Sequence, residues 1–173
     1  MNPVHVVAAR NIRSAVGDKM QNPYQKITEI LDSQSIKYEV TEHEPVYTSE
    51  QAAKVRNESI NTGAKSLLLK VDSNFILVVL PGGKRLSSKK VKDIFRLKSL
   101  RFATPQEVKE IMGCGIGACY PLGKIIGLKT IVGSALLEND EISFNPGLHD
   151  KTIKLKLKDY LLIADAEVAD ISE

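Results

Sequence analysis

Two long apolar runs separated by three polar residues limit most strongly what this chain can fold into. The first run is "AKSLLLKV" at 64–71, the second is "FILVVL" at 75–80, and "DSN" lies between them. Two apolar runs of strand length on either side of a tight polar turn predict a β-hairpin. Because the apolar residues are almost continuous, we expect both strands to be buried on both faces, as in the middle of a covered sheet.

Weaker patterns on either side of the hairpin predict the other elements. Alternating or continuous apolar residues predict strands at 36–43, 100–103, 128–132, 141–145 and 151–158. Helical spacing and N-terminal cap residues predict helices at 23–35, 48–56, 87–98, 104–112 and 159–165. Because the helices are distributed irregularly among the strands, the order favours an α+β fold with a mixed β-sheet over a doubly wound βαβ series.

Two of these helices begin with the pattern of a capping box. Thr48 is followed by Gln51, and Thr104 is followed by Glu107. In a capping box the first side chain binds the backbone N–H three residues on, and the second side chain binds the backbone N–H of the first residue. We therefore expect helices to begin at Thr48 and Thr104.

The length of the chain predicts one domain that follows a short leader. At 173 residues the chain can bury a substantial core in one domain, which we expect to span residues 21–173. Residues 1–20 have no acid before Asp18 and no long apolar segment, which disfavours a secretory signal. We expect a poorly ordered leader there. A weak organelle-targeting peptide, a cloning remnant and a true start at Met20 are the alternatives.

The composition limits the partners and cofactors that we expect. A net charge of +3 permits a nucleic-acid partner without requiring one, and the absence of Trp with 5% aromatic residues argues against a platform for stacking single-stranded bases. No apolar run approaches the ~20 residues of a membrane helix. The cysteines and histidines lack the spacing of metal ligands, so we expect no metal, no cofactor and a reducing, cytoplasmic location; they are Cys114, Cys119, His5, His43 and His149.

An unusual glycine-rich segment follows the helix predicted at 104–112. The segment is "GCGIGACYPLG" at 113–123, and six of the eleven glycines of the chain lie between Gly113 and Gly133. A dinucleotide-binding G-x-G-x-x-G loop needs a strand before it and a helix after it, and neither this order nor the spacing is present. The segment is therefore either a structural turn of small residues or a concave wall that brings bare backbone N–H groups to a ligand.

Five segments occur in an order that is typical of one protein family. They are "HEPVYTSEQAA" (43–53), "GAKSLLLK" (63–70), "LVVLPGGKRLSSKKVK" (77–92), "GIGACYPLG" (115–123) and, near the end, "ISFNPG" with "TIKLKLKDY". From about Tyr24 onward the chain resembles the YbaK/ProX family of trans-editing aminoacyl-tRNA deacylases, which is similar to the editing domain inserted in bacterial prolyl-tRNA synthetases. The resemblance implies an α+β fold with a mixed, strongly curved sheet and helices packed around it.

The resemblance also implies a reaction, the hydrolysis of the ester that joins a wrongly attached amino acid to the 3′ end of a tRNA. The amino acid implied is small or medium, of the Ala, Cys or Pro type, and the partners implied are the tRNA acceptor end and a synthetase. Lys65 would supply a positive charge, while the amides of Gly117, Ala118 and Cys119 would face the carbonyl oxygen. A ribose hydroxyl of the substrate would assist the attacking water, so that no Ser-His-Asp set is needed.

Further residues are placed around the substrate by the same resemblance. Those near the amino acid pocket are His43, Pro45, Tyr47, Thr48, Tyr120 and Pro121. Those expected to contact tRNA phosphates belong to a basic cluster and are Lys84, Arg85, Lys89, Lys90 and Arg96. The chain departs from the family at Gly133, where an aspartate is common, and this change bears on substrate identity or activity. Tyr120 is also bulkier than the usual residue and is expected to narrow the pocket.

The same residues allow other interpretations. A non-catalytic module with this fold would hold an RNA end or another carbonyl ligand without hydrolysing it. Cys119 could act as the nucleophile of a hydrolase or as the redox partner of Cys114. Without the resemblance, Lys65 is a solvated lysine at the start of a strand, and the basic cluster is the solvated face of a helix.

Overall fold

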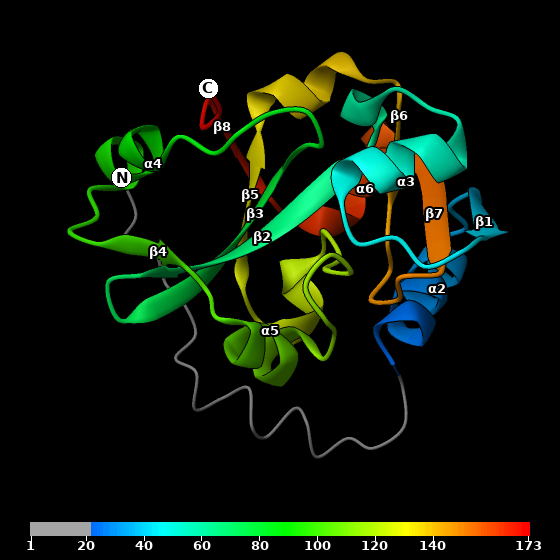
Figure 1. The fold of residues 1–173 in the computed structure, drawn as a ribbon, viewed down its shortest axis with the longest axis horizontal. Helices are drawn as coiled ribbons and strands as arrows, with labels where there is room; N and C mark the ends of the chain where they lie inside the picture. The colour runs from blue at the N-terminus through cyan, green and yellow to red at the C-terminus, as the bar shows by residue number, and fades with distance from the viewer. Residues whose placement is uncertain (1–21) are drawn as a thin grey trace.

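Residues 22–173 are described by the structure, a computed structural model of the chain. The leader predicted at residues 1–20 lies outside the described residues. The α-helices in Figure 1 are α2 (Pro23–Ser33), α3 (Ser49–Arg56), α4 (Ser88–Phe95), α5 (Pro105–Met112) and α6 (Leu157–Ala164). Short 3₁₀ helices are η2 (Ile60–Thr62), η3 (Gly123–Ile126) and η4 (Ser134–Glu138). Within residues 22–173, no helix has both the length and the apolar character needed to cross a membrane.

The strands form two sheets. Their bounds are β1 (Tyr38–Glu42), β2 (Ala64–Val71), β3 (Asn74–Pro81), β4 (Leu100–Phe102), β5 (Lys129–Gly133), β6 (Glu141–Phe144), β7 (Lys151–Lys156) and β8 (Glu167–Ala169). The larger sheet has the order β4-β2-β3-β5-β8, in which β5 is parallel to β3 and β8 and the other pairs are antiparallel. The smaller sheet has the order β1-β7-β6 and is antiparallel. The prediction of an α+β fold with a mixed sheet is confirmed.

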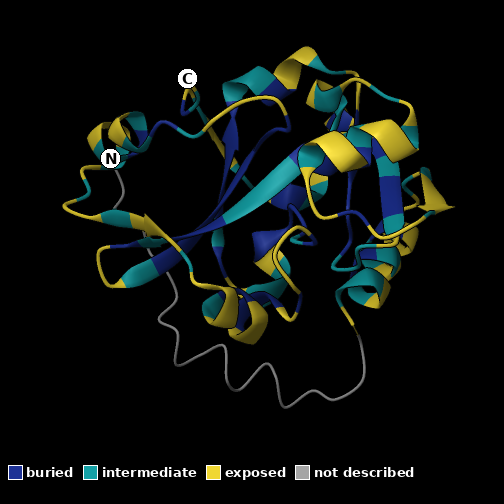
Figure 2. Cartoon of the chain, in the orientation of Figure 1, coloured by how far each residue is buried: buried dark blue, intermediate teal, exposed yellow. Residues whose placement is uncertain are grey.

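The predicted hairpin of β2 and β3 lies in the middle of the larger sheet. The two strands pair antiparallel over their whole lengths. Asp72 begins the turn with a φ of 50°, and its carboxylate accepts the amide of Ser99 at 2.9 Å. From Phe75 onward β3 is buried, as expected, but β2 is only half-buried over residues 65–67 (Figure 2). Those three residues line a cavity, which explains the difference from the prediction.

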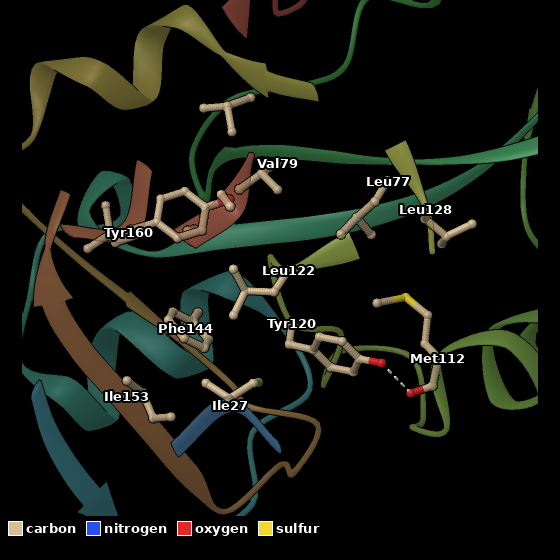
Figure 3. Close-up of a cluster of buried hydrophobic side chains, with 14 of the residues drawn as sticks. Ile27, Leu77, Val79, Met112, Tyr120, Leu122, Leu128, Phe144, Ile153 and Tyr160 are labelled. Carbon is tan, nitrogen blue, oxygen red and sulfur yellow. Dashed lines mark hydrogen bonds between the residues drawn. The ribbon is translucent and has the colours of Figure 1, made fainter. Parts of the chain in front are cut away.

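Hydrophobic cores cover both faces of the larger sheet, because successive side chains of β3 point to opposite faces. Leu77 and Val79 point into the larger core, which also receives side chains of α2, α5 and α6 (Figure 3). Ile76 and Val78 point into the smaller core, which α4 covers. Each fully buried aliphatic side chain stabilises the fold by roughly 1.5–3 kcal/mol, so this doubly covered strand contributes much of the stability.

Two buried tyrosines tie the glycine-rich segment to the larger core (Figure 3). The hydroxyl of Tyr120 donates to the carbonyl of Met112 at 2.8 Å, and the hydroxyl of Tyr160 donates to the carbonyl of Pro121 at 2.7 Å. Both side chains are at most 1% exposed. A buried hydroxyl has lost its water and needs a protein partner, so these bonds fix the segment on its core side.

Some local details differ from the sequence prediction. Thr48 caps α3 by accepting the amide of Gln51 at 3.1 Å, as predicted, but the side chain of Gln51 accepts the amide of Tyr47 instead of that of Thr48. The second predicted capping box is complete. The helix α6 begins at Leu157, earlier than predicted, and β8 has no predicted counterpart because three residues are too few to show a pattern.

The bond made by Tyr160 leads to a stability prediction. We expect Tyr160→Phe to lower the free energy of unfolding by about 1–3 kcal/mol, because the buried carbonyl of Pro121 loses a donor. Tyr38→Phe is the control, since the Tyr38 hydroxyl donates to Asp32 in an exposed pair, and we expect a loss below about 0.5 kcal/mol. Urea unfolding measures both variants, and equal losses would contradict the role given to Tyr160.

Candidate functional site

A cavity of about 470 Å³ opens between β2, α3 and the glycine-rich segment. The glycine-rich segment is far from α3 and β2 in the sequence, but all three contribute to the lining of this cavity. Its lining includes Lys65 and Ser66 of β2, Thr48 and Arg56 at the two ends of α3, Phe102 of β4, and Ile116, Gly117 and Cys119 of the glycine-rich segment. The structure therefore brings Lys65 and the bend at Gly117 to the same cavity.

Gly117 is the point where the glycine-rich segment touches the chain before α3. Its φ is 88°, and a Cβ atom there would lie 2.6 Å from the carbonyl oxygen of Tyr47. No L side chain fits so close to a backbone atom, and the left-handed conformation adds a further penalty. The segment is thus both a turn that requires glycine and a wall of the cavity.

Of the three amides predicted to face a substrate oxygen, one already donates a hydrogen bond within the protein. Ala118 donates to the carbonyl of Gly115 at 3.1 Å, and its side chain is fully buried. The amides of Gly117 and Cys119 donate to no other residue in the described part of the chain. Both residues line the cavity, so a bound ligand could accept hydrogen bonds from these two amides.

A half-buried arginine supports the Gly117 peptide through Asn145. Asn145 donates its side-chain N–H to the carbonyl of Gly117 at 3.1 Å, and Arg56 donates to the Asn145 oxygen at 2.5 Å. The guanidinium also donates to the hydroxyl of Thr152 on β7 at 2.8 Å. Burial lowers the pKa of Arg56 to about 10, and nearby Glu58 opposes this shift. Arg56 therefore stays charged at neutral pH and places a fixed cation in the cavity wall.

His43 belongs to this network and does not line the cavity. Its Nδ1 lies 2.7 Å from the carbonyl of Glu44, and its Nε2 lies 2.7 Å from the hydroxyl of Thr152. A carbonyl can only accept, so neutral His43 carries its proton on Nδ1, and Nε2 accepts from Thr152. This leaves the Thr152 oxygen free to accept from Arg56, which orients the guanidinium.

Lys65 is held at the cavity by backbone carbonyls. Its ammonium donates to the carbonyl of Gly82 at 3.2 Å and to that of Lys84. Burial lowers the pKa of Lys65; Glu50 opposes this effect, and Arg85 adds to it. The ammonium is therefore a positioned charge and not a freely solvated one.

Two of the six residues predicted near the substrate line the cavity, namely Tyr47 and Thr48. The other four lie outside its lining and are His43, Pro45, Tyr120 and Pro121. The ring of Tyr120 lies in the larger core (Figure 3), so its size does not narrow the cavity. Sequence reasoning missed Arg56 and Asn145, whose roles depend on partners far away in the chain.

Gly133 does not line the cavity either. It is buried at the end of β5, where a Cβ atom would lie 2.6 Å from Cδ2 of Leu80.

Among the residues that line the cavity, the acidic one is Glu58. Its Oε1 bonds to Lys154 at 3.0 Å and to Ser143 at 3.2 Å, whereas its Oε2 is buried without a partner among the described residues. The hydroxyl oxygen of Ser66 is also buried without a partner there.

The two cysteines are reduced and lie side by side. The Sγ atoms of Cys114 and Cys119 are 3.9 Å apart. The hydrogen bond to Cys119 and burial both raise the pKa of Cys114. Within residues 22–173, no group of three or more His, Cys, Asp or Glu residues is arranged to hold a metal ion.

The cations predicted to contact phosphates fall into two groups. Lys84 and Arg85 follow β3, and Lys84 adjoins the cavity because its carbonyl accepts from Lys65. The second group belongs to α4 and its C-cap, at the opposite end of the molecule from α2 (Figure 1), and consists of Lys89, Lys90 and Arg96. Two lysines of this group pair with carboxylates at 3.0 Å, so the first group is the better placed to act at the cavity.

One family recurs in comparisons with known proteins. A family model described as "Aminoacyl-tRNA editing domain" matches residues 43–163. The Escherichia coli (strain K12) protein named "Multifunctional Ser/Thr-tRNA deacylase ProXp-y" is 31% identical over 152 residues, which cover 85% of this chain and 91% of that protein. A proline–tRNA ligase of Staphylococcus haemolyticus (strain JCSC1435) is 27% identical over 118 residues, which cover 68% of this chain and 20% of the ligase. A crystal structure described as that of a candidate trans-editing enzyme for prolyl tRNA synthetase is similar with a TM-score of 0.76 at 26% identity, covering 90% of this chain and 99% of that chain.

The contact at Gly117 predicts that this position does not accept a side chain. We expect Gly117→Ala to lower the free energy of unfolding by about 1–3 kcal/mol more than Gly113→Ala does, because overpacking against backbone adds to the conformational penalty. Gly113 is a matched control, since its φ is also positive, at 68°, but an added Cβ meets nothing within 4 Å. Denaturant unfolding compares the two variants, and similar losses would argue against the close contact.

Proposed function

Since this chain belongs to the aminoacyl-tRNA editing domain family, we propose that it is a deacylase that hydrolyses the ester between a wrongly attached amino acid and the 3′ end of a tRNA. The observation that carries the proposal is that Lys65 and the bare backbone at Gly117 line one cavity. The Escherichia coli relative, which is named a tRNA deacylase, supports the same reaction. Such a reaction preserves the fidelity of translation.

The cavity offers charge stabilisation where ester cleavage requires it. When water attacks the ester, negative charge builds on the carbonyl oxygen. The amides of Gly117 and Cys119 are available for this oxygen, whereas the amide of Ala118 is occupied. An ammonium has three N–H donors, and Lys65 uses two of them on backbone carbonyls, which leaves one for the substrate. In this scheme a ribose hydroxyl of the tRNA assists the water, and no protein nucleophile takes part.

The wall of the cavity bears on which amino acid is removed. The resemblance implies an amino acid of the Ala, Cys or Pro type, and the relative from Escherichia coli is named for Ser and Thr. The unpartnered oxygens of Ser66 and Glu58 favour a ligand that brings hydrogen-bond donors, because buried polar atoms are costly when left unpaired. We therefore propose a small amino acid, whose ammonium or hydroxyl group would meet these oxygens.

Binding of tRNA is proposed to begin with the cations beside the cavity. Lys84 and Arg85 would contact phosphates near the acceptor end, and the α4 cations would extend this contact along the RNA. Such binding weakens steeply as salt rises, because phosphate contacts release counterions. A synthetase partner is proposed from the similarity to part of proline–tRNA ligases. We also propose a cytoplasmic location, which is consistent with a tRNA substrate.

A second candidate is a non-catalytic module that holds the aminoacyl end of a tRNA. It is motivated by the sequence alone, since the resemblance implies an aspartate where this chain has Gly133, and Gly133 itself does not line the cavity. Salt-dependent tRNA binding without turnover of any aminoacyl-tRNA would support this candidate over the deacylase.

The role of Lys65 predicts a large effect on turnover. We expect Lys65→Ala to lower deacylation by roughly 10²–10³-fold, because a charge that stabilises the transition state is lost. Lys70→Ala is the matched control, since Lys70 lies on the same strand but does not line the cavity, and we expect it to lose little activity. The assay is hydrolysis of labelled alanyl-, cysteinyl-, prolyl-, seryl- and threonyl-tRNA. Full activity of Lys65→Ala, or no hydrolysis of any substrate by the unmodified protein, would refute the deacylase proposal.

The proposed mechanism predicts that removing the thiol of Cys119 has only a small effect on deacylation. We expect Cys119→Ala to lower deacylation by less than about tenfold, because the substitution keeps the amide and removes only a small lining group. A thiol nucleophile would instead give a loss of roughly 10³-fold or more, as removal of an essential nucleophile does. Single-turnover hydrolysis of the preferred aminoacyl-tRNA distinguishes the two mechanisms.

A further inference from the structure

Three exposed apolar side chains line the cavity. Nine large apolar side chains are exposed in residues 22–173, and three of them line this cavity: Tyr47 (59% exposed), Phe102 (55%) and Ile116 (54%). Single exposed apolar residues are normal on a protein surface. Three that line one cavity give it an exposed apolar surface that a ligand can cover.

The surroundings of these side chains hold them in place. The amide of Tyr47 donates to the side chain of Gln51 at 2.9 Å, and the Tyr47 ring lies against the ring of His149 with centroids 4.6 Å apart. His149 in turn donates through Nε2 to the carbonyl of Ile116 at 2.9 Å. Phe102 lies on β4, paired with Leu69 of β2. The rings are therefore presented to solvent from fixed backbone positions.

Positive charges line the same cavity as these side chains. They belong to Arg56 and Lys65, and the backbone of Lys84 adjoins the cavity through its carbonyl. Aromatic faces combined with a positively charged groove are the chemistry that binds single-stranded nucleic acid, with bases on the rings and phosphates on the cations. A membrane or a protein partner would need a wider apolar area than three side chains provide. The low aromatic content excludes a platform for many bases, but one base needs only one or two rings.

We propose that Tyr47 and Phe102, with Ile116 beside them, bind the terminal base of the tRNA 3′ end while the acyl group enters the cavity. The proposal rests on the deacylase function and names the part of the substrate that docks outside the reacting ester. In this arrangement the base fixes the depth to which the ester enters, so that the carbonyl carbon meets the bend at Gly117.

A fluorescent base at the RNA end tests the proposal directly. The probe is an acceptor-stem RNA hairpin that ends in CCA, with 2-aminopurine in place of the terminal adenine, because stacking quenches the fluorescence of this base. We expect quenching on titration with the unmodified protein. We expect Phe102→Ala and Tyr47→Ala each to abolish most of the quenching and to weaken binding by roughly 5- to 100-fold. Leu162→Ala is the matched control, since Leu162 is 79% exposed on α6 and does not line the cavity, and it should behave as the unmodified protein.

A second measurement needs no variant. The unmodified protein should bind a hairpin with an abasic terminal nucleotide more weakly, by the same factor, than the hairpin with a terminal base. Undiminished quenching in both aromatic variants, or equal affinity for the two hairpins, would overturn the proposal. Deacylation without quenching would refute base stacking and leave the deacylase intact, whereas quenching without deacylation would refute the deacylase and leave base binding intact.

Discussion

The contact between Gly117 and the carbonyl of Tyr47 determines the shape of the cavity. Because Gly117 has no side chain, the glycine-rich segment approaches the start of α3 closely enough to form a wall of the cavity. The buried hydroxyls of Tyr120 and Tyr160 fix this segment from the core, and Asn145 fixes it from the other side. These constraints act on the same few residues, so the wall is set when the chain folds.

Arg56 explains why the smaller sheet matters to a cavity that receives lining residues from β2 and β4 of the larger sheet. A half-buried guanidinium is costly unless its N–H groups find acceptors, and the acceptors for Arg56 are Thr152 on β7 and Asn145 just after β6. Since Asn145 also holds the Gly117 carbonyl, one charged group links the smaller sheet to the bend that a substrate would meet. The site therefore lies at the junction of the two sheets.

Much of the fold could be predicted from the sequence, because its signals are local. The apolar runs of the hairpin and the cap at Thr48 depend on neighbours within a few residues, and the structure reproduces both. The lining roles of Arg56 and Phe102 could not be predicted in this way, because they depend on which distant segments meet. Tyr120 is a further example. The sequence shows that its side chain is large, but the direction of its ring depends on the hydrogen bond to the carbonyl of Met112, which the sequence does not reveal. That Lys65 lies near the glycine-rich segment could be predicted only from the resemblance to a family, which rests on the order of the motifs.

The two carbonyls that hold the ammonium of Lys65 have a consequence for how the site responds to a substrate. A lysine side chain that is free in solvent must lose rotamer entropy and shed water at the moment it engages a ligand. Lys65 has met most of that penalty during folding, and so its remaining N–H is preorganised. An incoming acyl group thus encounters an electrostatic environment that needs little rearrangement, which is the condition under which a single charge is most effective.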